Sequence, residues 1–432
     1  MRIQDNNSYS KSEFKKTYPK ISVKLIDKTL SVLSNESNIF IFPSDFSMID
    51  DLESSSKIIE TINEELKFQN IAGFIGCGGE NLEIHSRFSQ NKDDYFLHYM
   101  LQKVLNINVV DLNTNLSMEE QIYQFLIYAF PQYLNAAMRK GIFKQYCRIE
   151  YNNVNVKGNI DIARHIKRNI PFTGKVAYSS REYTQDNDLM QLVRHTIEYI
   201  RLSTKNGQLI LNSSELMKQN IASIILATPS FNLGNKRKVI NANRNTPLRH
   251  AYYTEYRLLQ QLCLLILTYR HHDLGGGAQN IHGILFDVSW LWEEYVNTIL
   301  KDQFIHPRNK KSKDGISIFS DRTRTVYPDF YNNELGIVID AKYKKLEFTS
   351  KGISREDLYQ IIGYSYILKS KTAGVVYPSV EKTKYNEIGR LSGYGALIFK
   401  QSIQIPQQVD SYKAFITLMK ESENKFKEQW NI

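Results

Sequence analysis

The hydrophobic pattern of residues 325–339 predicts a β-hairpin. Residues 325–331 alternate and are rich in β-branched and aromatic side chains, which is typical of a strand. Asn332 and Asn333 follow, and asparagine tolerates the positive φ that a tight turn needs. Residues 336–339, Gly-Ile-Val-Ile, form a continuous apolar run. We therefore expect two antiparallel strands, of which the second is buried.

The same reading predicts helices and further strands around this hairpin. Residues 357–368 place apolar and tyrosine side chains as a helix packed on a sheet would. Residues 285–296 are expected to form a helix that leads to the sheet. Strands are predicted at 372–378 and 395–399, and a closing amphipathic helix at 415–426. The expected fold class is α/β, with a C-terminal mixed sheet flanked by helices.

The chain before the hairpin alternates shorter elements and predicts an α+β region. Residues 1–20 are polar and basic, so we expect them to be loose. The predicted strands are 21–25, 39–42, 71–76 and 81–85, the last two as a hairpin around Gly78 and Gly79. The predicted helices are 47–66, 94–105 and 118–140, and a long helix from about 252. A further hairpin is expected to turn at Asn152 and Asn153.

These elements suggest three consecutive domains: 1–145, a basic middle region at 146–247, and 248–432. A length of 432 residues with 42% hydrophobic side chains supports a real core and excludes wholesale disorder. No run of about eighteen apolar residues is present, and the N-terminus lacks the apolar segment of a signal peptide. The three cysteines are far apart, so no disulfide or zinc framework is expected. A cytoplasmic location is predicted.

Charge points to nucleic acid as a partner. The net charge is +10 and the pI is about 9.1, which suits phosphate binding but is also common in lysine-rich chains. One basic cluster lies just before the hairpin, and we expect it to contact the DNA backbone. Its members are Arg308, Lys310, Lys311, Lys313, Arg322 and Arg324.

The predicted hairpin carries the candidate chemistry. Asp329 follows Pro328, and a turn at Asn332–Asn333 brings it to the same end as Asp340. Two carboxylates at one point repel unless a cation lies between them, and hard oxygen ligands suit Mg²⁺ or Mn²⁺. Lys342 is two residues beyond Asp340 and projects from the same face of the strand. Two acids and a lysine can bind a metal, orient water and stabilise a phosphate under attack.

This order of residues is similar to the signature of the PD-(D/E)xK nuclease superfamily. That resemblance makes Asp329 and Asp340 metal ligands, with the backbone carbonyl of Ala341 as a further ligand. Gln360 and Tyr364 are four residues apart and resemble the Gln-x-x-x-Tyr motif, whose glutamine orients the site.

The motifs together resemble the McrC family, the nuclease subunits of McrBC and LlaJI-type restriction systems. They are Leu-Trp-Glu-Glu-Tyr-Val at 291–296, the Pro-Asp, Ile-Asp-Ala-Lys-Tyr-Lys at 339–344 and Asp-Leu-Tyr-Gln-x-x-x-Tyr at 357–364. Residues 156–171 and 183–192 are similar to the middle region of that family. By its place in the motif, Glu293 is the accessory acid and metal ligand, with Glu294 as the alternative.

The resemblance implies a DNA endonuclease that works on double-stranded DNA with a hexameric AAA+ GTPase of the McrB type. Its N-terminal part, the range 1–145, would dock on that partner and stimulate GTP hydrolysis. The sequence contains no Gly-x-x-x-x-Gly-Lys-Ser/Thr loop, so no nucleotide is expected on this chain. Two alternatives stay open: a stand-alone repair or recombination nuclease, and a non-catalytic scaffold that activates the motor.

Overall fold

The computed structural model divides the chain into two compact units, Met1–Phe125 with Gly275–Ile432, and Leu126–Leu274. These units do not follow the three consecutive ranges predicted from the sequence, because residues after 275 join the N-terminal part. The structure describes all residues except 1, 31, 34–37, 43–55, 91–93, 105–117, 204–206, 249, 251, 269–280, 308–314, 347–352, 429, 431 and 432.

The first unit contains a five-stranded N-terminal sheet that is completed by a strand from late in the sequence. Its order is β1 (Ile3–Gln4), β7 (Glu80–His85), β6 (Ile71–Cys77), β11 (His282–Asp287) and β3 (Asn38–Phe42). The predicted β6–β7 hairpin and the predicted strand at β3 are confirmed. β11 lies between β6 and β3, so the N-terminal sheet needs a segment that the sequence analysis placed in the C-terminal domain. The helix predicted at 285–296 begins only at Val288, because residues 285–287 belong to β11.

Three predictions for the first 70 residues are wrong. Residues 1–20 are not loose, because β1 pairs with β7, and Ile3 and Phe14 are buried. Residues 21–25 are helical, because Pro19 favours a helix start and Ile21 and Leu25 bury one helical face. The described part of the predicted helix 47–66 contains strands instead of a helix. The elements that the structure has in these three regions are β2 (Ser8–Ser10), α1 (Lys11–Thr17), α2 (Pro19–Leu25), β4 (Ile59–Ile62) and β5 (Glu65–Phe68).

The short β4–β5 hairpin explains why the helix prediction failed. Asn63 turns the chain with a φ of 55°, a value that ends any helix. Ile59, Leu66 and Phe68 are then buried from alternating strand positions. Their spacing fits the period of a strand as well as that of a helix, so pattern alone did not separate the two.

A second five-stranded sheet carries the predicted catalytic hairpin. Its order is β14 (Phe330–Asn332), β15 (Ile337–Ala341), β16 (Thr372–Ser379), β18 (Leu397–Gln404) and β17 (Tyr385–Arg390). The three central strands are parallel and the two outer strands are antiparallel. A short pair, β12 (Ile316–Ser317) and β13 (Thr325–Val326), precedes it.

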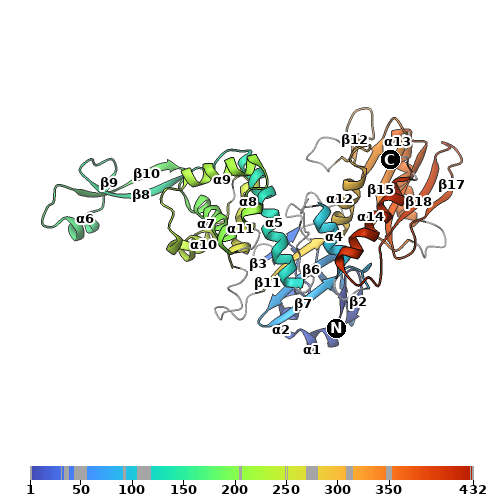
Figure 1. The fold of residues 1–432 in the computed structure, drawn as a ribbon, viewed down its shortest axis with the longest axis horizontal. Helices are drawn as coiled ribbons and strands as arrows, with labels where there is room; N and C mark the ends of the chain where they lie inside the picture. Colours follow the sequence, from blue (N-terminus) through green and yellow to red (C-terminus); the bar gives the residue numbers. More distant parts are fainter. Residues whose placement is uncertain are drawn as a thin grey trace. The chain divides into compact units, whose positions relative to one another are not determined.

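Among the described residues, three helices pack on this sheet: α12 (Val288–Leu300), α13 (Arg355–Leu368) and α14 (Tyr412–Glu428) (Figure 1). A fourth helix, α4 (Tyr95–Val104), packs against α12 and α14. Val338, Ala373 and Val375 pack in one cluster with Ile361 of α13, so apolar side chains fix α13 beside the catalytic strand. The α/β fold class with a mixed sheet and flanking helices is confirmed. No helix in the described part of the chain is long and apolar enough to cross a membrane.

The second unit consists of a helical cluster and a long ribbon, a three-stranded sheet in which β8 and β10 are the long strands (Figure 1). The helices are α5 (Met118–Met138, whose first residues belong to the other unit), α7 (Asp188–Ser203), α8 (Gly207–Leu211), α9 (Glu215–Ala227), η2 (Leu233–Asn235), α10 (Lys236–Asn245) and α11 (Thr254–Thr268). The ribbon contains β8 (Gln145–Asn153), β9 (Asn159–Ile160), α6 (Ile162–Asn169) and β10 (Val176–Thr184).

The hairpin predicted at Asn152 and Asn153 is wrong. β8 runs through both residues and pairs over its whole length with β10, which lies further along the chain. Tyr151 stacks on Tyr178 across the two strands, with ring centroids 5.3 Å apart. The residues predicted as the returning strand are exposed, with 68% of Val154 in contact with solvent. Cross-strand aromatic packing therefore selects β10 as the partner.

Candidate active site

The β14–β15 hairpin brings Asp329 and Asp340 to one end of the second sheet. Phe330 pairs with Ile339, so the residues on either side of that pair are neighbours. The Ala341 N–H donates to Asp329 Oδ2 at 2.6 Å, which fixes Asp329 against the end of β15. The sequence analysis placed the positive φ of the turn at Asn332 and Asn333. In the structure it lies at Gly336, with a φ of 66°. Glycine adopts this conformation with no steric cost.

Lys342 lies directly against Asp340. Its Nζ is 2.7 Å from Asp340 Oδ2, while Asp340 is only 1% exposed. Asp340 Oδ2 otherwise accepts no directed hydrogen bond from the described residues. Burial lowers the pKa of Lys342, but the charges of Asp340 and Asp329 outweigh burial and raise this pKa above its ordinary value. Lys342 is therefore a charged ammonium group at neutral pH.

Gln360 fixes the position of the lysine. Lys342 Nζ donates to Gln360 Oε1 at 2.9 Å, and Gln360 Nε2 donates to the Tyr364 hydroxyl at 2.9 Å. Gln360 and Tyr364 lie on successive turns of α13, as their four-residue spacing predicts. This chain of hydrogen bonds orients the amide and, through it, the lysine.

Glu293 enters the site from α12. This helix begins at Val288, where Asp287 accepts hydrogen bonds from the Ser289 and Trp290 N–H groups. Glu293 lines the same pocket as both aspartates, whereas Glu294 is not among the lining residues. His306 Nε2 lies 3.6 Å from Glu293 Oε1, and its Nδ1 contacts the main-chain oxygen of Asp329. This placement favours Glu293 over Glu294 as the accessory acid.

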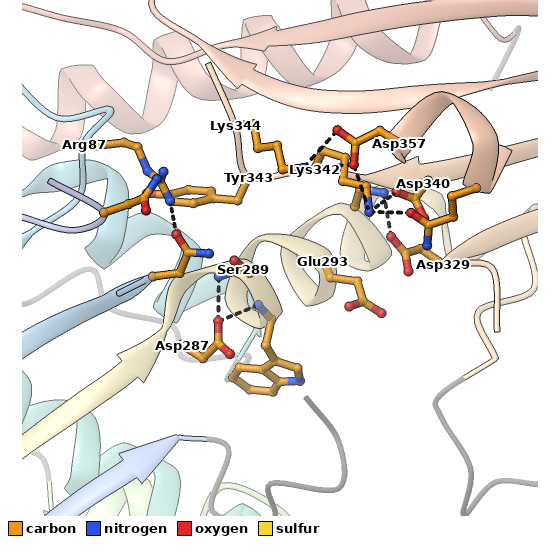
Figure 2. Close-up of a pocket in the computed structure, with 15 residues that line it drawn as sticks. Arg87, Asp287, Ser289, Glu293, Asp329, Asp340, Lys342, Tyr343, Lys344 and Asp357 are labelled. Carbon is orange, nitrogen blue, oxygen red and sulfur yellow. Dashed lines mark hydrogen bonds and ion pairs between the residues drawn. The ribbon is translucent and has the colours of Figure 1, made fainter. Parts of the chain in front are cut away.

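Asp329, Asp340, Lys342, Gln360 and Glu293 line one pocket of about 450 Å³ (Figure 2). Asp329, Asp340 and Lys342 lie at one end, and Arg87 and Tyr343 lie towards the other. The sequence analysis did not find several of its members: Asn6, Asn70, Arg87, Asp287, Ser289, Trp290, Tyr343, Lys344 and Asp357. The first three come from the N-terminal sheet region, and no signal in the sequence connects them with the hairpin.

Lys344 and Asp357 could have been found from the sequence. Lys344 is two residues beyond Lys342, and Asp357 begins the motif that ends at Tyr364. Lys344 Nζ lies 2.9 Å from both carboxylate oxygens of Asp357, and the Ser354 hydroxyl donates to one of them at 2.8 Å. Lys342 Nζ is 3.8 Å from the same carboxylate. Asp357 is thus a buried anion shared by two lysines.

The predicted DNA-contact cluster is described only in part. Arg322 and Arg324 are exposed between β12 and β13 and do not line the pocket. The other four predicted residues lie outside the described residues: Arg308, Lys310, Lys311 and Lys313. The assignment of this cluster to DNA stays a prediction.

The residues present suit a hard divalent cation. Asp329, Asp340 and Glu293 supply carboxylate oxygens to one pocket, and the buried Oδ2 of Asp340 has only the lysine ammonium beside it. In the described part of the chain, no three Asp, Glu, His or Cys side chains already form a metal-binding group. The ligand chemistry therefore fits Mg²⁺ or Mn²⁺, but the described side chains are not gathered around one point.

Comparison with known proteins decides the family. The family model of the McrBC 5-methylcytosine restriction system component matches residues 66–378 of this chain. The chain belongs to this McrBC family. The resemblance drawn from the sequence motifs is confirmed. No curated protein matches the sequence.

Two solved structures are similar to the chain at low sequence identity. One is a half-complex from the tetradecameric assembly of Thermococcus gammatolerans McrB AAA+ hexamers with bound McrC, at 14% identity, with 99% of each chain covered and a TM-score of 0.44. The other is the Thermococcus gammatolerans McrBC complex, at 15% identity, with 70% of this chain and 87% of that chain covered and a TM-score of 0.29. Scores this low carry no structural argument, so membership of the McrBC family rests on the family model alone.

Proposed function

We propose that this McrBC-family chain is the DNA endonuclease subunit of a GTP-dependent restriction system. The observation that carries the proposal is the meeting of Asp329, Asp340 and Lys342 in one pocket at the ends of two paired strands. Burying the Asp340 carboxylate costs stability, which its pairing with Lys342 offsets only in part, and phosphodiester hydrolysis uses this combination of groups.

Mg²⁺, or Mn²⁺ in its place, is the proposed cofactor. Asp329, Asp340 and Glu293 would hold it, together with the main-chain carbonyl of Ala341. When bound, such an ion supplies a more acidic water and polarises the phosphate. Cysteine is absent from the pocket lining in the described part of the chain, so the donors favour Mg²⁺ over Zn²⁺.

Lys342 acts as an electrostatic group in this mechanism and not as a base. Its raised pKa keeps the proton on Nζ at neutral pH. During hydrolysis, the oxygen of water bonds to phosphorus and one phosphorus–oxygen ester bond breaks, while negative charge grows on the non-bridging oxygens. The ammonium group stabilises that charge, and Gln360 holds it in place through the 2.9 Å hydrogen bond.

A McrB-type AAA+ GTPase is the proposed partner. The matched family is described as a restriction system component, and this sequence has no phosphate loop of its own. GTP hydrolysis on the partner would supply the motion along DNA that restriction at a distance requires. The partner contacts are proposed for the N-terminal region and for the second unit. None of the residues that line the nuclease pocket comes from the second unit.

The experiment compares wild-type chain with Asp340→Asn, a change of charge with nearly the same shape. Both are assayed with a McrB-type AAA+ GTPase, with Mg²⁺ and GTP. We expect Asp340→Asn to lose cleavage by at least about a hundredfold while GTP turnover is still stimulated. The full chain is required, because any fragment that ends before β11 removes a central strand from the N-terminal sheet.

Each alternative predicts a different result. A scaffold whose nuclease site is vestigial would give no cleavage with wild-type chain but normal stimulation of the GTPase. A stand-alone nuclease would cut DNA efficiently with no partner and no nucleotide. Cleavage by Asp340→Asn at the wild-type rate would contradict the assignment of the site.

A further inference from the structure

The end of the pocket away from the aspartates is built from the N-terminal sheet region. Asn6, Asn70 and Arg87 belong to that region, and they line the pocket together with Trp290 of α12 and the residues of the aspartate end. The proposed hydrolysis uses none of the four side chains named here. A volume of about 450 Å³ is in the range of small-molecule sites, so the pocket has room for more than one phosphate group.

Asn70 is held by contacts at both its main chain and its side chain. Its main-chain oxygen accepts from the Val288 N–H at 3.1 Å, at the first turn of α12. Its side-chain Oδ1 accepts a short hydrogen bond from Arg87 Nη2. Because the guanidinium occupies the oxygen side of the amide, the Nδ2 group is the part left for the pocket. Asn70 Nδ2 donates to no partner in the described part of the chain.

Arg87 itself is not available to a ligand. The residue is 8% exposed, forms a 2.9 Å ion pair with Asp5 and lies 4.8 Å from the centre of the Tyr343 ring. Asp5 also accepts from the Arg87 main-chain N–H. This pairing neutralises the guanidinium, so its role is to orient Asn70. The linked residues Asp5, Arg87 and Asn70 form a preorganised support for one amide donor group.

Two further donor groups belong to residues that line the pocket, Asn6 and Trp290. The Asn6 main-chain N–H donates to Gln69, while its side-chain amide bonds to no residue that the structure describes. The Trp290 indole N–H also donates to no described residue. Asp287 is the carboxylate at this end, and its Oδ1 is taken by the Ser289 and Trp290 N–H groups. Its Oδ2 is buried at the same place, so this part of the pocket combines neutral amide and indole donors with one carboxylate.

We propose that Asn70 binds the DNA backbone at the phosphate next to the scissile one. The proposal rests on the proposed nuclease function, since the aspartate end must hold the scissile phosphate. A DNA strand crossing the pocket places its next phosphate at the other end, where Asn70 Nδ2 donates to an oxygen and Asn6 and Trp290 supply further donors. Asparagine side chains are common phosphate ligands in protein–DNA contacts. The N-terminal sheet thus contributes to substrate binding.

The test is Asn70→Asp in the full chain, with DNA affinity as the readout. Aspartate keeps the shape of the side chain and the oxygen that accepts from Arg87. It replaces the Nδ2 donor group with a negatively charged oxygen that would face the phosphate. A purely structural role predicts unchanged or higher stability, since Arg87 then faces a full charge, and a loss of affinity no larger than that caused by the same charge added elsewhere on the chain. The binding role predicts an affinity for a fluorescent duplex, measured in Ca²⁺, that is weaker by about tenfold or more.

Asn81→Asp is the matched control, because it adds the same charge at an exposed position of β7 outside the pocket. We expect it to change affinity by less than about twofold. Asn6→Asp is a second test variant that breaks no side-chain hydrogen bond with a described residue, and it should also weaken binding. Equal affinities for Asn70→Asp, Asn6→Asp and Asn81→Asp overturn the inference.

The assay separates this inference from the function on which it rests. If wild-type chain cuts DNA with its partner and Asn70→Asp binds as tightly as wild type, only the Asn70 contact is wrong. If wild-type chain neither binds nor cuts DNA, the nuclease function fails and the Asn70 contact fails with it.

Discussion

The Tyr343 hydroxyl lies 2.6 Å from Ser86 Oγ, a hydrogen bond between buried groups 257 positions apart in the sequence. Tyr343 directly follows Lys342, and Ser86 directly follows β7 of the N-terminal sheet. The Tyr343 ring also packs edge-on against Phe88 at 4.9 Å. The end of the catalytic strand is therefore held by the N-terminal sheet, and the two sheets share one structural support for the lysine.

Tyr343→Phe tests the contribution of this hydrogen bond to stability. The ring packing is kept, but the Ser86 hydroxyl loses its buried partner, so we expect unfolding to require about 1 kcal/mol less free energy. Urea unfolding followed by fluorescence measures the change. Tyr359→Phe is the control, because Tyr359 is 64% exposed. Equal loss in the two variants would show that the Ser86 contact contributes nothing.

The sequence was most informative where chemistry and local geometry coincide. A two-residue step places Asp340 and Lys342 on one face, and a four-residue step aligns Gln360 with Tyr364. Such steps are fixed by the backbone periods of strand and helix, so spacing alone predicts these pairs. The structure brings together Asp329, Asp340 and Lys342 as predicted, and Glu293 lines the same pocket.

Contacts between distant segments were beyond the sequence. Arg87 and Asn70 reach the pocket because β11 inserts beside β6, and no local pattern specifies which strands pair. The error at residues 21–25 has a related cause, since a short apolar run fits a strand or a helix until its burial partners are known. Long-range pairing decided both cases.

Asp357→Asn should reduce both stability and cleavage. The substitution removes the buried charge that Lys344 contacts at 2.9 Å and that lies 3.8 Å from Lys342. Lys344 is half-exposed, so the stability loss should be only about 1 kcal/mol. Cleavage should fall by about tenfold because Lys342 is held less firmly.

Glu356→Gln is the control for the Asp357 variant, because the neighbouring Glu356 side chain is exposed. Cleavage rates with partner and GTP, and urea unfolding of the chain alone, give the two readouts. If Asp357→Asn cuts at the wild-type rate, the Asp357 carboxylate has no part in positioning the lysine.

Metal removal should abolish cleavage. The pocket offers carboxylate oxygens from Asp329, Asp340 and Glu293, which favour Mg²⁺ and Mn²⁺. We expect activity to stop in excess chelator and to return with either ion, whereas Ca²⁺ supports DNA binding without turnover. The partner GTPase itself needs a nucleotide and a metal ion. GTP turnover is therefore measured in the same reactions as cleavage, as a control for loss of the partner's activity. Full cleavage in excess chelator would exclude the metal mechanism.

The buried His98 should make stability depend on pH in the acid range. Burial, with a smaller effect of His85, lowers the pKa of His98 from 6.5 to about 3. Below pH 6.5 the unfolded chain takes up a proton that the folded chain refuses, so stability is lost as pH falls towards 3. At pH 5 this effect is about 2 kcal/mol. Burial raises the pKa of both Asp5 and Asp94 to about 6, and these groups act in the opposite direction.

Comparing wild type with His98→Gln isolates the histidine, because the aspartates are common to both proteins. The variant cannot take up the proton in either state. The stability of wild type relative to the variant should therefore fall by about 2 kcal/mol between pH 7.5 and pH 5. Urea unfolding at the two pH values measures it, with His250→Gln as the control at an exposed histidine. A difference between wild type and His98→Gln that is the same at both pH values would contradict a neutral, buried His98.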